Sequence, residues 1–233
     1  MLIQSAGGSA EQVRADFDRI ALVSALDREE LGPYSEFLLG HVPAGCARVL
    51  EVGCGLGAFA RLVAQRACSV TAVDLSPQML RAAGERSRSH PNLQFILGDF
   101  LRLDLPPETY DCVVTTTTLH HLPLAQALGK MKSLIRPGGV LIVHDLLEPD
   151  GLFDTALNFV RLPVSCAMRF RRTGRFRQRR EVRQAWDEHG RHETYLKAED
   201  VRAMRDEHLP GALVRLHLLW RYTVVWHKPD VGS

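Results

Sequence analysis

The chain has 233 residues, of which 45% are hydrophobic and 24% are charged, and its formal net charge at pH 7 is +2. This composition is typical of a globular protein with a full core, and the small net charge does not by itself support nucleic acid as a partner. The five cysteines are scattered and form no CxxC pair, which disfavours disulfides and zinc and favours free thiols in a reducing compartment.

The first residues, MLIQSAGGSA, lack the charged and then apolar pattern of a signal peptide, and no run approaches the length of a membrane span. We therefore expect a cytoplasmic protein. Apolar residues over 10–41 recur at a mixed spacing of three and four, which predicts helices, and Pro33 marks a break or a helix start.

From residue 47 onward, short strand-like runs alternate with helix-like stretches. Nearly continuous apolar strands that alternate with helices indicate βαβ units and a parallel sheet that is covered on both faces. The predicted strands are 47–52, 69–74, 93–97, 110–116 and 139–144, and the predicted helices between them are 57–67, 76–88 and 122–135.

This alternation stops at about residue 147. Residues 152–170 are mostly apolar but are interrupted by Asp154, Arg161 and Pro163, and an arginine-rich stretch overlaps their end and reaches Arg183. A further helix fits 197–208. Two strand-like runs, 212–218 and 221–227, follow closely enough to form a hairpin-like pair.

The stretch VLEVGCGLG, residues 49–57, predicts a strand that runs into a glycine turn and then a helix. Glycine permits positive φ angles and a close approach of a ligand to the backbone, and the helix start offers free N–H groups. The GxGxG spacing is one residue shorter than the GxGxxG pattern of dinucleotide sites. Glu51 before the turn would repel a pyrophosphate and suits a cationic ligand. A plain strand–turn–helix connection without a ligand is the alternative.

Two further acids follow predicted strands. Asp74 could accept hydrogen bonds from ribose hydroxyls, although it could instead cap the helix that begins at Ser76-Pro77. Asp99 could accept from an adenine amino group while Phe100 packs on the ring, although the same residues could form an ordinary polar turn. The run Arg136-Pro137-Gly138-Gly139 predicts a helix stop and a tight turn on either interpretation.

These motifs follow one another along the chain as they do in the class I S-adenosylmethionine-dependent methyltransferases of the small-molecule type, which the sequence resembles. The matching stretches are VLEVGCGLG, VTAVDLSPQML, LQFILGDF, YDCVVTTTTLHHLP and LIRPGGVLIVHD, within about residues 45–146. The resemblance implies a doubly wound, Rossmann-like α/β fold with a seven-stranded sheet, mostly parallel with an antiparallel last strand, plus N-terminal helices and a helical lid insertion. It implies one methyltransferase domain over 1–233 with four parts: an N-terminal helical cap (1–44), a cofactor-binding core (45–147), the lid insertion (148–195), and a last helix with the terminal strand pair (196–233).

The resemblance also implies roles for individual residues in binding S-adenosylmethionine, which would leave as S-adenosylhomocysteine. Glu51 and the turn Gly53, Cys54, Gly55 and Gly57 would cradle the methionine part. Asp74 would hold the ribose, and Leu75 and Met79 would flank the adenosine. Asp99 would bind the adenine amine beside Phe100, and the Thr115 carbonyl would face the amino group of the cofactor.

Methyl transfer from a sulfonium needs alignment of the acceptor and exclusion of water, and it needs a base only if the acceptor must first lose a proton. His120 and His121, just past the fourth strand, are the candidate catalytic residues, although they could merely support a loop. His144 and Asp145 form a second candidate pair with the same alternative. No HExxH motif or Cys/His metal spacing occurs, so we expect no metal.

Four consecutive threonines, Thr115 to Thr118, stand where methyltransferases of base amino groups tend to carry an Asn/Asp-Pro-Pro-aromatic motif, which disfavours nucleobase methylation. We expect the 148–195 insertion to line an acceptor pocket with apolar side chains, with an ordinary amphipathic helix as the alternative. The arginines between 169 and 183 are more simply explained as a solvated basic face than as a site for an acidic substrate, nucleic acid or membrane. Peripheral membrane contact is retained as a less favoured reading.

We therefore expect an enzyme that transfers a methyl group to oxygen, nitrogen or carbon of a small molecule, apolar or acidic in character. A tRNA or protein methyltransferase that uses the arginine-rich insertion is one alternative. A protein that binds S-adenosylmethionine without catalysis is another. The sequence alone does not indicate the oligomeric state.

Overall fold

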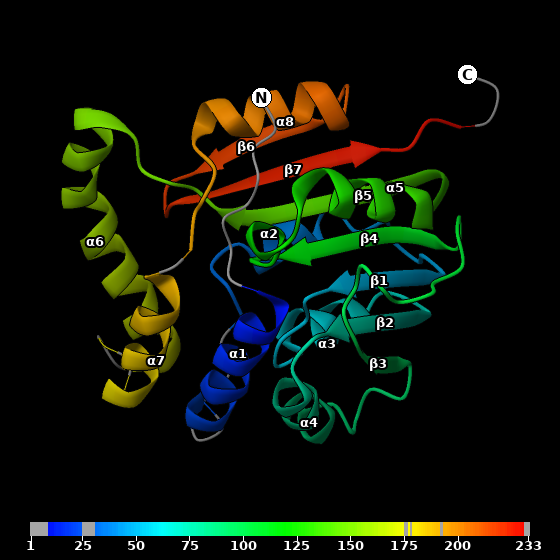
Figure 1. The fold of residues 1–233 in the computed structure, drawn as a ribbon, viewed down its shortest axis with the longest axis horizontal. Coiled ribbons are helices and arrows are strands. Elements are labelled where there is room, and N and C mark those ends of the chain that lie inside the picture. The colour runs from blue at the N-terminus through cyan, green and yellow to red at the C-terminus, as the bar shows by residue number, and fades with distance from the viewer. Residues whose placement is uncertain (1–8, 25–30, 175–176, 178, 192, 231–233) are drawn as a thin grey trace.

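The computed structural model describes residues 9–24, 31–174, 177, 179–191 and 193–230. One seven-stranded sheet organises them, with the strand order β3-β2-β1-β4-β5-β7-β6 (Figure 1). The strands are β1 (Arg48–Val52), β2 (Ser69–Asp74), β3 (Leu93–Leu97), β4 (Tyr110–Thr116), β5 (Ile135–Leu146), β6 (Leu213–His217) and β7 (Arg221–His227).

The first five strands pair in parallel, and β7 is antiparallel to both of its neighbours, β5 and β6. The predicted fold class, with a mostly parallel sheet and an antiparallel last strand, is confirmed. The chain order reverses between β1 and β4, and this is the place where open α/β sheets bind ligands at the carboxyl ends of their strands.

The helices lie on both faces of the sheet and along one of its edges. They are α1 (Ala10–Ser24), α2 (Ser35–Leu39), α3 (Ala58–Ala64), α4 (Pro77–Arg86), η1 (Leu119–His121, a 3-10 turn), α5 (Leu124–Leu134), α6 (Gly151–Thr173), α7 (Arg180–Gly190) and α8 (Ala198–His208). Among the described residues, no helix combines the length and the apolar character that a bilayer crossing requires.

Alternate residues of the central strands pack into two separate hydrophobic cores, one on each face of the sheet, as expected for a sheet that is covered on both faces. In β5, Val140 and Ile142 pack with α2 and α3, whereas Leu141 and Val143 pack with α5 and α8. All four of these side chains are fully buried. This double burial explains why the strands read as continuous apolar runs in the sequence.

A helix stop and a tight turn were predicted at Arg136-Pro137-Gly138-Gly139, and the second part of this prediction is wrong. The helix does stop at Leu134, but these residues form the irregular start of β5 rather than a tight turn. The register between β4 and β5 shifts between Tyr110 and Cys112, which accommodates the extra residues as a bulge. The hydrogen bond from the Gly138 N–H to the Lys228 carbonyl ties this start to the end of the chain.

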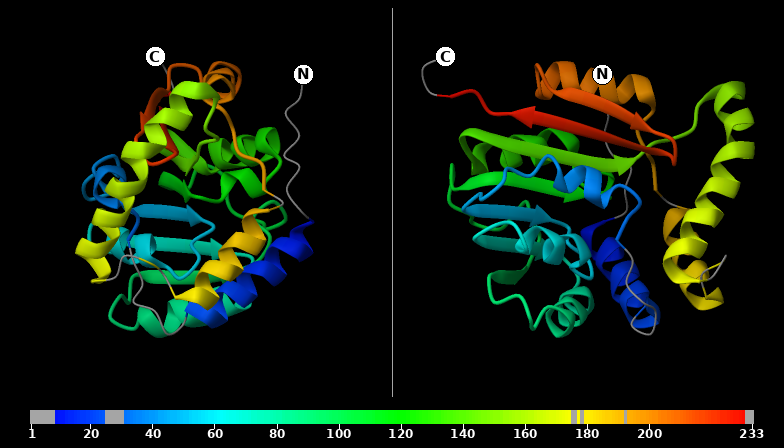
Figure 2. Two further views of the ribbon diagram at one scale, coloured as in Figure 1. Left: turned by 90° about the vertical axis from the view of Figure 1, so that its left-hand side faces the viewer. Right: turned by 180° about the vertical axis from the view of Figure 1, so that it is seen from behind.

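A group of helices from distant parts of the sequence gathers at the carboxyl ends of the parallel strands. Helices α1, α6 and α7 stand together beyond this edge of the sheet, while α3 and α5 lie over its faces (Figures 1 and 2). Helix α1 packs against both α4 and α7, and Ile20, Met79 and Ala185 form a small core between the three helices. The edge that should bind a ligand is therefore covered by helices rather than open.

Candidate active site

The glycine turn after β1 has the positive φ angles that its three glycines predict. Gly53, Gly55 and Gly57 all have positive φ angles, of 74°, 52° and 76°. A Cβ atom at Gly53 would lie 2.1 Å from Oγ1 of Thr118, whereas a Cβ at Gly55 would meet nothing within 4 Å. Gly53 is therefore required by packing, and Gly55 presents bare backbone to open space.

Asp74 closes this turn from the end of β2. Its Oδ2 accepts the N–H of Gly55 at 2.7 Å, and its Oδ1 accepts the N–H of Ser76 at 2.9 Å. Burial raises the pKa of the Asp74 carboxyl above its ordinary value, against the lowering effect of these backbone hydrogen bonds. The N-cap of α4 is Ser76, whose Oγ accepts the N–H of Met79, so the alternative in which Asp74 caps this helix does not describe its contacts.

The end of β3 contributes the second predicted acid. Oδ1 of Asp99 accepts the N–H of Leu101 at 2.9 Å, and its other oxygen lies 3.5 Å from Arg102. Phe100 is buried, and the ammonium of Lys130 lies 5.2 Å from its ring centre. Asp99 is thus fixed by a tight turn, and its two oxygens have further lone pairs that could accept from a ligand.

A cavity of about 700 Å³ joins these features, and this volume is in the range of small-molecule sites. Most of the predicted cofactor residues line it. They are Glu51, Gly53, Cys54, Gly55, Asp74, Leu75, Met79, Asp99 and Phe100. Glu51 is only 1% exposed although it faces the cavity, because helices cover this edge of the sheet.

Two predicted cofactor residues lie behind the cavity wall. Gly57 forms the N-cap of α3 and donates its N–H to the Cys54 carbonyl. Thr115 is fully buried, and its hydroxyl donates to the Val52 carbonyl at 3.0 Å. The cavity is lined by Thr116, one residue further along β4.

The opposite half of the cavity has a largely apolar wall that no sequence motif announced. Residues of five different segments contribute to it, among them Phe17 of α1, Tyr34 before α2, Met168 of α6, Trp186 of α7, and Trp220 between β6 and β7. The Phe17 and Trp186 rings meet edge to face, with centres 6.1 Å apart. The lid insertion thus supplies apolar side chains to the cavity.

The predicted histidine pair divides between two cavities. His121 lines the large cavity, whereas His120 lines a neighbouring one of about 250 Å³. Nδ1 of His120 lies 2.7 Å from Oδ1 of Asp145, and Oδ2 of Asp145 accepts a hydrogen bond from the backbone N–H of His120. Burial would raise the pKa of Asp145, but the charge and hydrogen bond of His120 outweigh it and hold that pKa below its ordinary value.

His121 has an acidic neighbour from the lid insertion. Nδ1 of His121 lies 3.1 Å from Oε2 of Glu193, and both side chains are about 95% buried. Burial lowers the pKa of His121, and Glu193 partly opposes this effect. Within the described part of the chain, neither ring nitrogen of His121 has a hydrogen-bond partner of acceptable geometry. A neutral imidazole with an unsatisfied nitrogen at the cavity wall can accept a proton from a bound molecule.

The same neighbourhood could be considered for a metal ion, because His120, His121 and Glu193 offer ligand atoms within 4.8 Å of one another. Nδ1 of His120 contacts Asp145, so Nε2 is the atom of this ring that remains for an ion, and Glu193 also lies 3.8 Å from His189. The arrangement is a hydrogen-bonding and ion-pair network that continues from His189 to Asp16 of α1.

The two side chains of the second predicted pair, His144 and Asp145, also face different cavities. His144 lines the large cavity, and its Nδ1 lies 2.9 Å from Oγ1 of Thr223. Burial and the nearby Arg221 lower the pKa of His144 to about 3, so it stays neutral. Asp145 instead faces His120. Neighbouring strand residues point to opposite faces, which separates the two side chains.

Sequence motifs missed Glu193 and the aromatic wall because these residues come from the insertion, from the N-terminal helices and from the β6–β7 turn. Each is ordinary in its local context, and only folding brings it to the sheet edge. The available signal was the apolar character of residues 152–170, which predicted that this segment lines a pocket but not which of its side chains face the cavity.

A parallel sheet with one antiparallel strand, a glycine turn after β1 and acids at the ends of β2 and β3 define a class I methyltransferase. The chain belongs to the class I S-adenosylmethionine-dependent methyltransferases. Residues 49–139 match the family model described as a methyltransferase domain. An uncharacterized methyltransferase of Mycobacterium tuberculosis is 33% identical over 198 residues, which cover 84% of this chain and 94% of that protein.

Two further comparisons, one of sequence and one of structure, cover different shares of the chain. The 2-methyl-6-phytyl-1,4-hydroquinone methyltransferase of Synechocystis is 31% identical over 128 residues, which cover 54% of this chain and 40% of that protein. The crystal structure of the N-methyltransferase NodS of Bradyrhizobium japonicum in complex with S-adenosylhomocysteine has a similar fold, with a TM-score of 0.63 and 17% identity. That alignment covers 93% of this chain and 98% of NodS.

Proposed function

We propose that this protein transfers the methyl group of S-adenosylmethionine to a small, largely apolar acceptor, with His121 as the base that removes a proton from the acceptor. The observation that carries the proposal is the continuity of one cavity from the glycine turn and Asp74 to His121 and the aromatic wall. The donor and the acceptor would lie in the two halves of this cavity.

The residues of the donor half fit the cofactor. The open space beside Gly55 would receive the methionine part, and the carboxylate of Glu51 would attract its cationic groups. Each oxygen of Asp74 accepts one backbone N–H and keeps a further lone pair for the ribose hydroxyls. Asp99, Phe100, Leu75 and Met79 would surround the adenosine. When bound, S-adenosylmethionine supplies an activated methyl group, so the protein needs to position the acceptor.

The acceptor half favours an apolar molecule over a nucleic acid. Aromatic and aliphatic side chains dominate its wall, and His121 adds an ionisable group whose ring nitrogens make no hydrogen bond of acceptable geometry within the described residues. Burial keeps His121 neutral, as a base must be, and Glu193 would stabilise the imidazolium formed on proton transfer. The Synechocystis relative, whose name specifies a phytyl hydroquinone, is consistent with an acceptor that combines an apolar body with an acidic proton.

The proposal is tested by measuring methyl transfer from radiolabelled S-adenosylmethionine to a panel of substituted hydroquinones and other apolar phenols, to bulk RNA and to protein. We expect label in a small apolar product. Labelling of RNA or protein alone would support the macromolecular alternative. Tight cofactor binding without labelling of any acceptor in a lipid and metabolite extract would support binding without catalysis.

A further inference from the structure

Helix α6 presents an unusual outward face. Between positions 159 and 170, every exposed residue is apolar or cysteine; besides Cys166, the residues of this outer face are Phe159, Val160, Leu162, Pro163, Ala167 and Phe170. Phe159 is 85% exposed and Leu162 is 58% exposed. A surface helix of a soluble protein ordinarily places polar residues on this side, and contiguous exposed apolar patches mark interaction sites.

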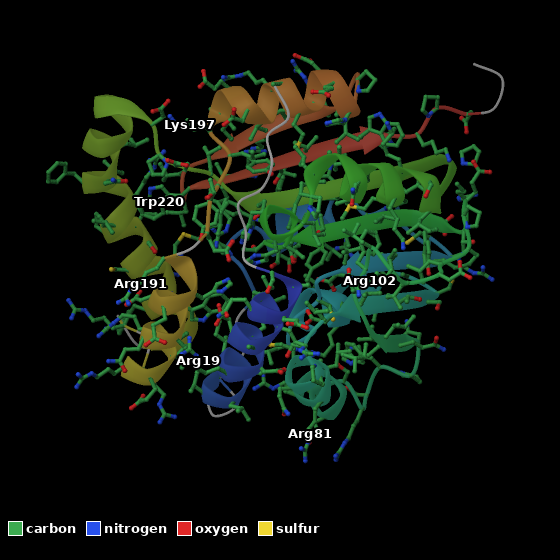
Figure 3. All side chains as sticks on the ribbon, viewed as in Figure 1. Arg19, Arg81, Arg102, Arg191, Lys197 and Trp220 are labelled. Atoms are coloured by element: carbon green, nitrogen blue, oxygen red, sulfur yellow. The ribbon has the colours of Figure 1, made fainter. Side chains whose placement is uncertain are left out.

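Within the same stretch, 159–170, the two arginines lie on the other side of the helix. Arg161 is buried with its guanidinium 5.6 Å from the ring centre of Trp220, and the indole N–H of Trp220 donates to Asn158 of α6. Trp220 lies between α6 and the sheet (Figure 3). The inner face of α6 also contributes Ser165, Met168 and Arg169 to the cavity. The polarity of this helix is therefore inverted relative to its surroundings.

Basic residues follow the outer face in the chain. Arg171, Arg177, Arg179, Arg180 and Arg183 are all exposed, whereas Glu181 is the one acid described between positions 171 and 183. Oε2 of Glu181 lies 3.8 Å from Arg179, so it offsets part of this charge. Further along α7, Asp187 and Glu188 are exposed, and Glu188 is paired with Arg19 of α1.

We propose that the outer face of α6 docks on the surface of a membrane that contains anionic lipid, with its apolar side chains in the interface and the following arginines on the lipid headgroups. Phe159 to Phe170 spans about 17 Å at 1.5 Å per residue, which suits a helix lying along a bilayer surface. Arginines beside an apolar strip are complementary in charge to an anionic headgroup layer. Since the opposite face of α6 lines the cavity, docking brings the cavity wall next to the lipid.

The test is flotation of the full-length protein with vesicles of phosphatidylcholine, with and without phosphatidylglycerol, at low and high salt. We expect binding to the anionic vesicles at low salt and weaker binding at high salt. The double variant Phe159→Glu/Leu162→Glu should reduce the binding at least about tenfold, because it places charge in the interface. Leu213→Glu, at an exposed leucine of β6 outside the proposed docking face, is the matched control and should bind as the natural chain does.

The double variant should keep its thermal unfolding temperature and its affinity for S-adenosylhomocysteine, because its two side chains are exposed and lie outside the cavity lining. Charge reversal by Arg177→Glu/Arg180→Glu should remove the preference for anionic over neutral vesicles. Failure to float with anionic vesicles at low salt overturns the proposal. So does a dimer in analytical ultracentrifugation that Phe159→Glu/Leu162→Glu dissociates without a change in vesicle binding. Neither readout uses methyl transfer, so failure here leaves the proposed reaction standing.

Discussion

Oδ2 of Asp74 accepts the backbone N–H of Gly55 at 2.7 Å, and this hydrogen bond adds a side-chain link between the end of β2 and the glycine turn to the two that the Val73 carbonyl makes. The carboxylate thereby holds in place the bare backbone that would receive the cofactor. Its cost is burial of a negative charge, which raises the pKa of Asp74. Asp74 thus acts in the structure of the turn as well as in the proposed binding of ribose.

Replacing Asp74 by Ala should weaken binding of S-adenosylmethionine by about 1–3 kcal/mol, because the ribose hydroxyls and the Gly55 N–H both lose an acceptor. Isothermal titration calorimetry with S-adenosylmethionine and S-adenosylhomocysteine measures the loss. Asp74→Asn is the control. Because it retains one carbonyl acceptor, its affinity for S-adenosylmethionine should lie between those of the natural chain and of Asp74→Ala. Unchanged affinity in Asp74→Ala, or heat from NAD in place of both compounds, would refute the assigned role.

The glycines of the turn should respond differently to the same substitution. Gly53→Ala should destabilise the fold by about 2–5 kcal/mol, because the new Cβ meets Thr118 and the φ angle is positive. Gly55→Ala should cost only the backbone strain, about 1–2 kcal/mol, because its Cβ meets no protein atom within 4 Å. Chemical denaturation measures both.

In Gly55→Ala, the added methyl group should nonetheless weaken cofactor binding, since it fills space at the cavity wall. The double variant Gly53→Ala/Thr118→Gly should recover part of the stability that Gly53→Ala loses. If Gly55→Ala binds S-adenosylhomocysteine as tightly as the natural chain, the methionine part does not lie against this residue.

His121→Gln should lower kcat about a hundredfold or more while leaving the affinity for S-adenosylhomocysteine nearly unchanged, provided that the acceptor must lose a proton. In the natural chain, activity should fall on the acid side through a pKa below 6.5, because burial lowers the pKa of His121. Glu193→Gln should shift this acid limb to still lower pH, since Glu193 raises that pKa. The pH dependence of kcat/KM distinguishes this role from a structural one. An unmoved acid limb in Glu193→Gln would contradict it.

Two buried histidines should make the fold sensitive to mild acid. His144 and His217 both contact Oγ1 of Thr223, and burial with nearby arginines lowers their pKa values to about 3 and about 4. The unfolded chain takes up these protons below pH 6.5, whereas the folded chain resists, so stability is lost progressively as the pH falls from about 6.5 toward 3. Thermal unfolding between pH 7 and 4 measures this loss.

The variant His217→Gln should flatten that pH dependence, because the amide cannot take up a proton in this range. The exposed His227 offers a control, and His227→Gln should follow the natural curve. Equal slopes for all three proteins would show that other groups govern the acid response.

The sequence by itself determined the sheet and its cofactor edge. The bounds of β2, β3 and β4 match the predicted runs 69–74, 93–97 and 110–116. β4 is recognisable because a strand buried on both faces is apolar almost without interruption, and β2 and β3 by their short β-rich runs. Gly53, Gly55 and Asp74 were recognisable because the turn requires positive φ angles and because parallel strands bring their carboxyl ends to one edge.

Only the tertiary structure decided which side chains share the cavity. His120 and His121 are adjacent in the chain, and their ring centres lie only 3.9 Å apart, yet they line different cavities. Glu193 reaches His121 across 72 positions of sequence, and α6 turns apolar side chains outward between 159 and 170 while Arg161 and Arg169 lie inward. These contacts depend on packing between segments that are distant in the chain, and local periodicity carries no information about such packing.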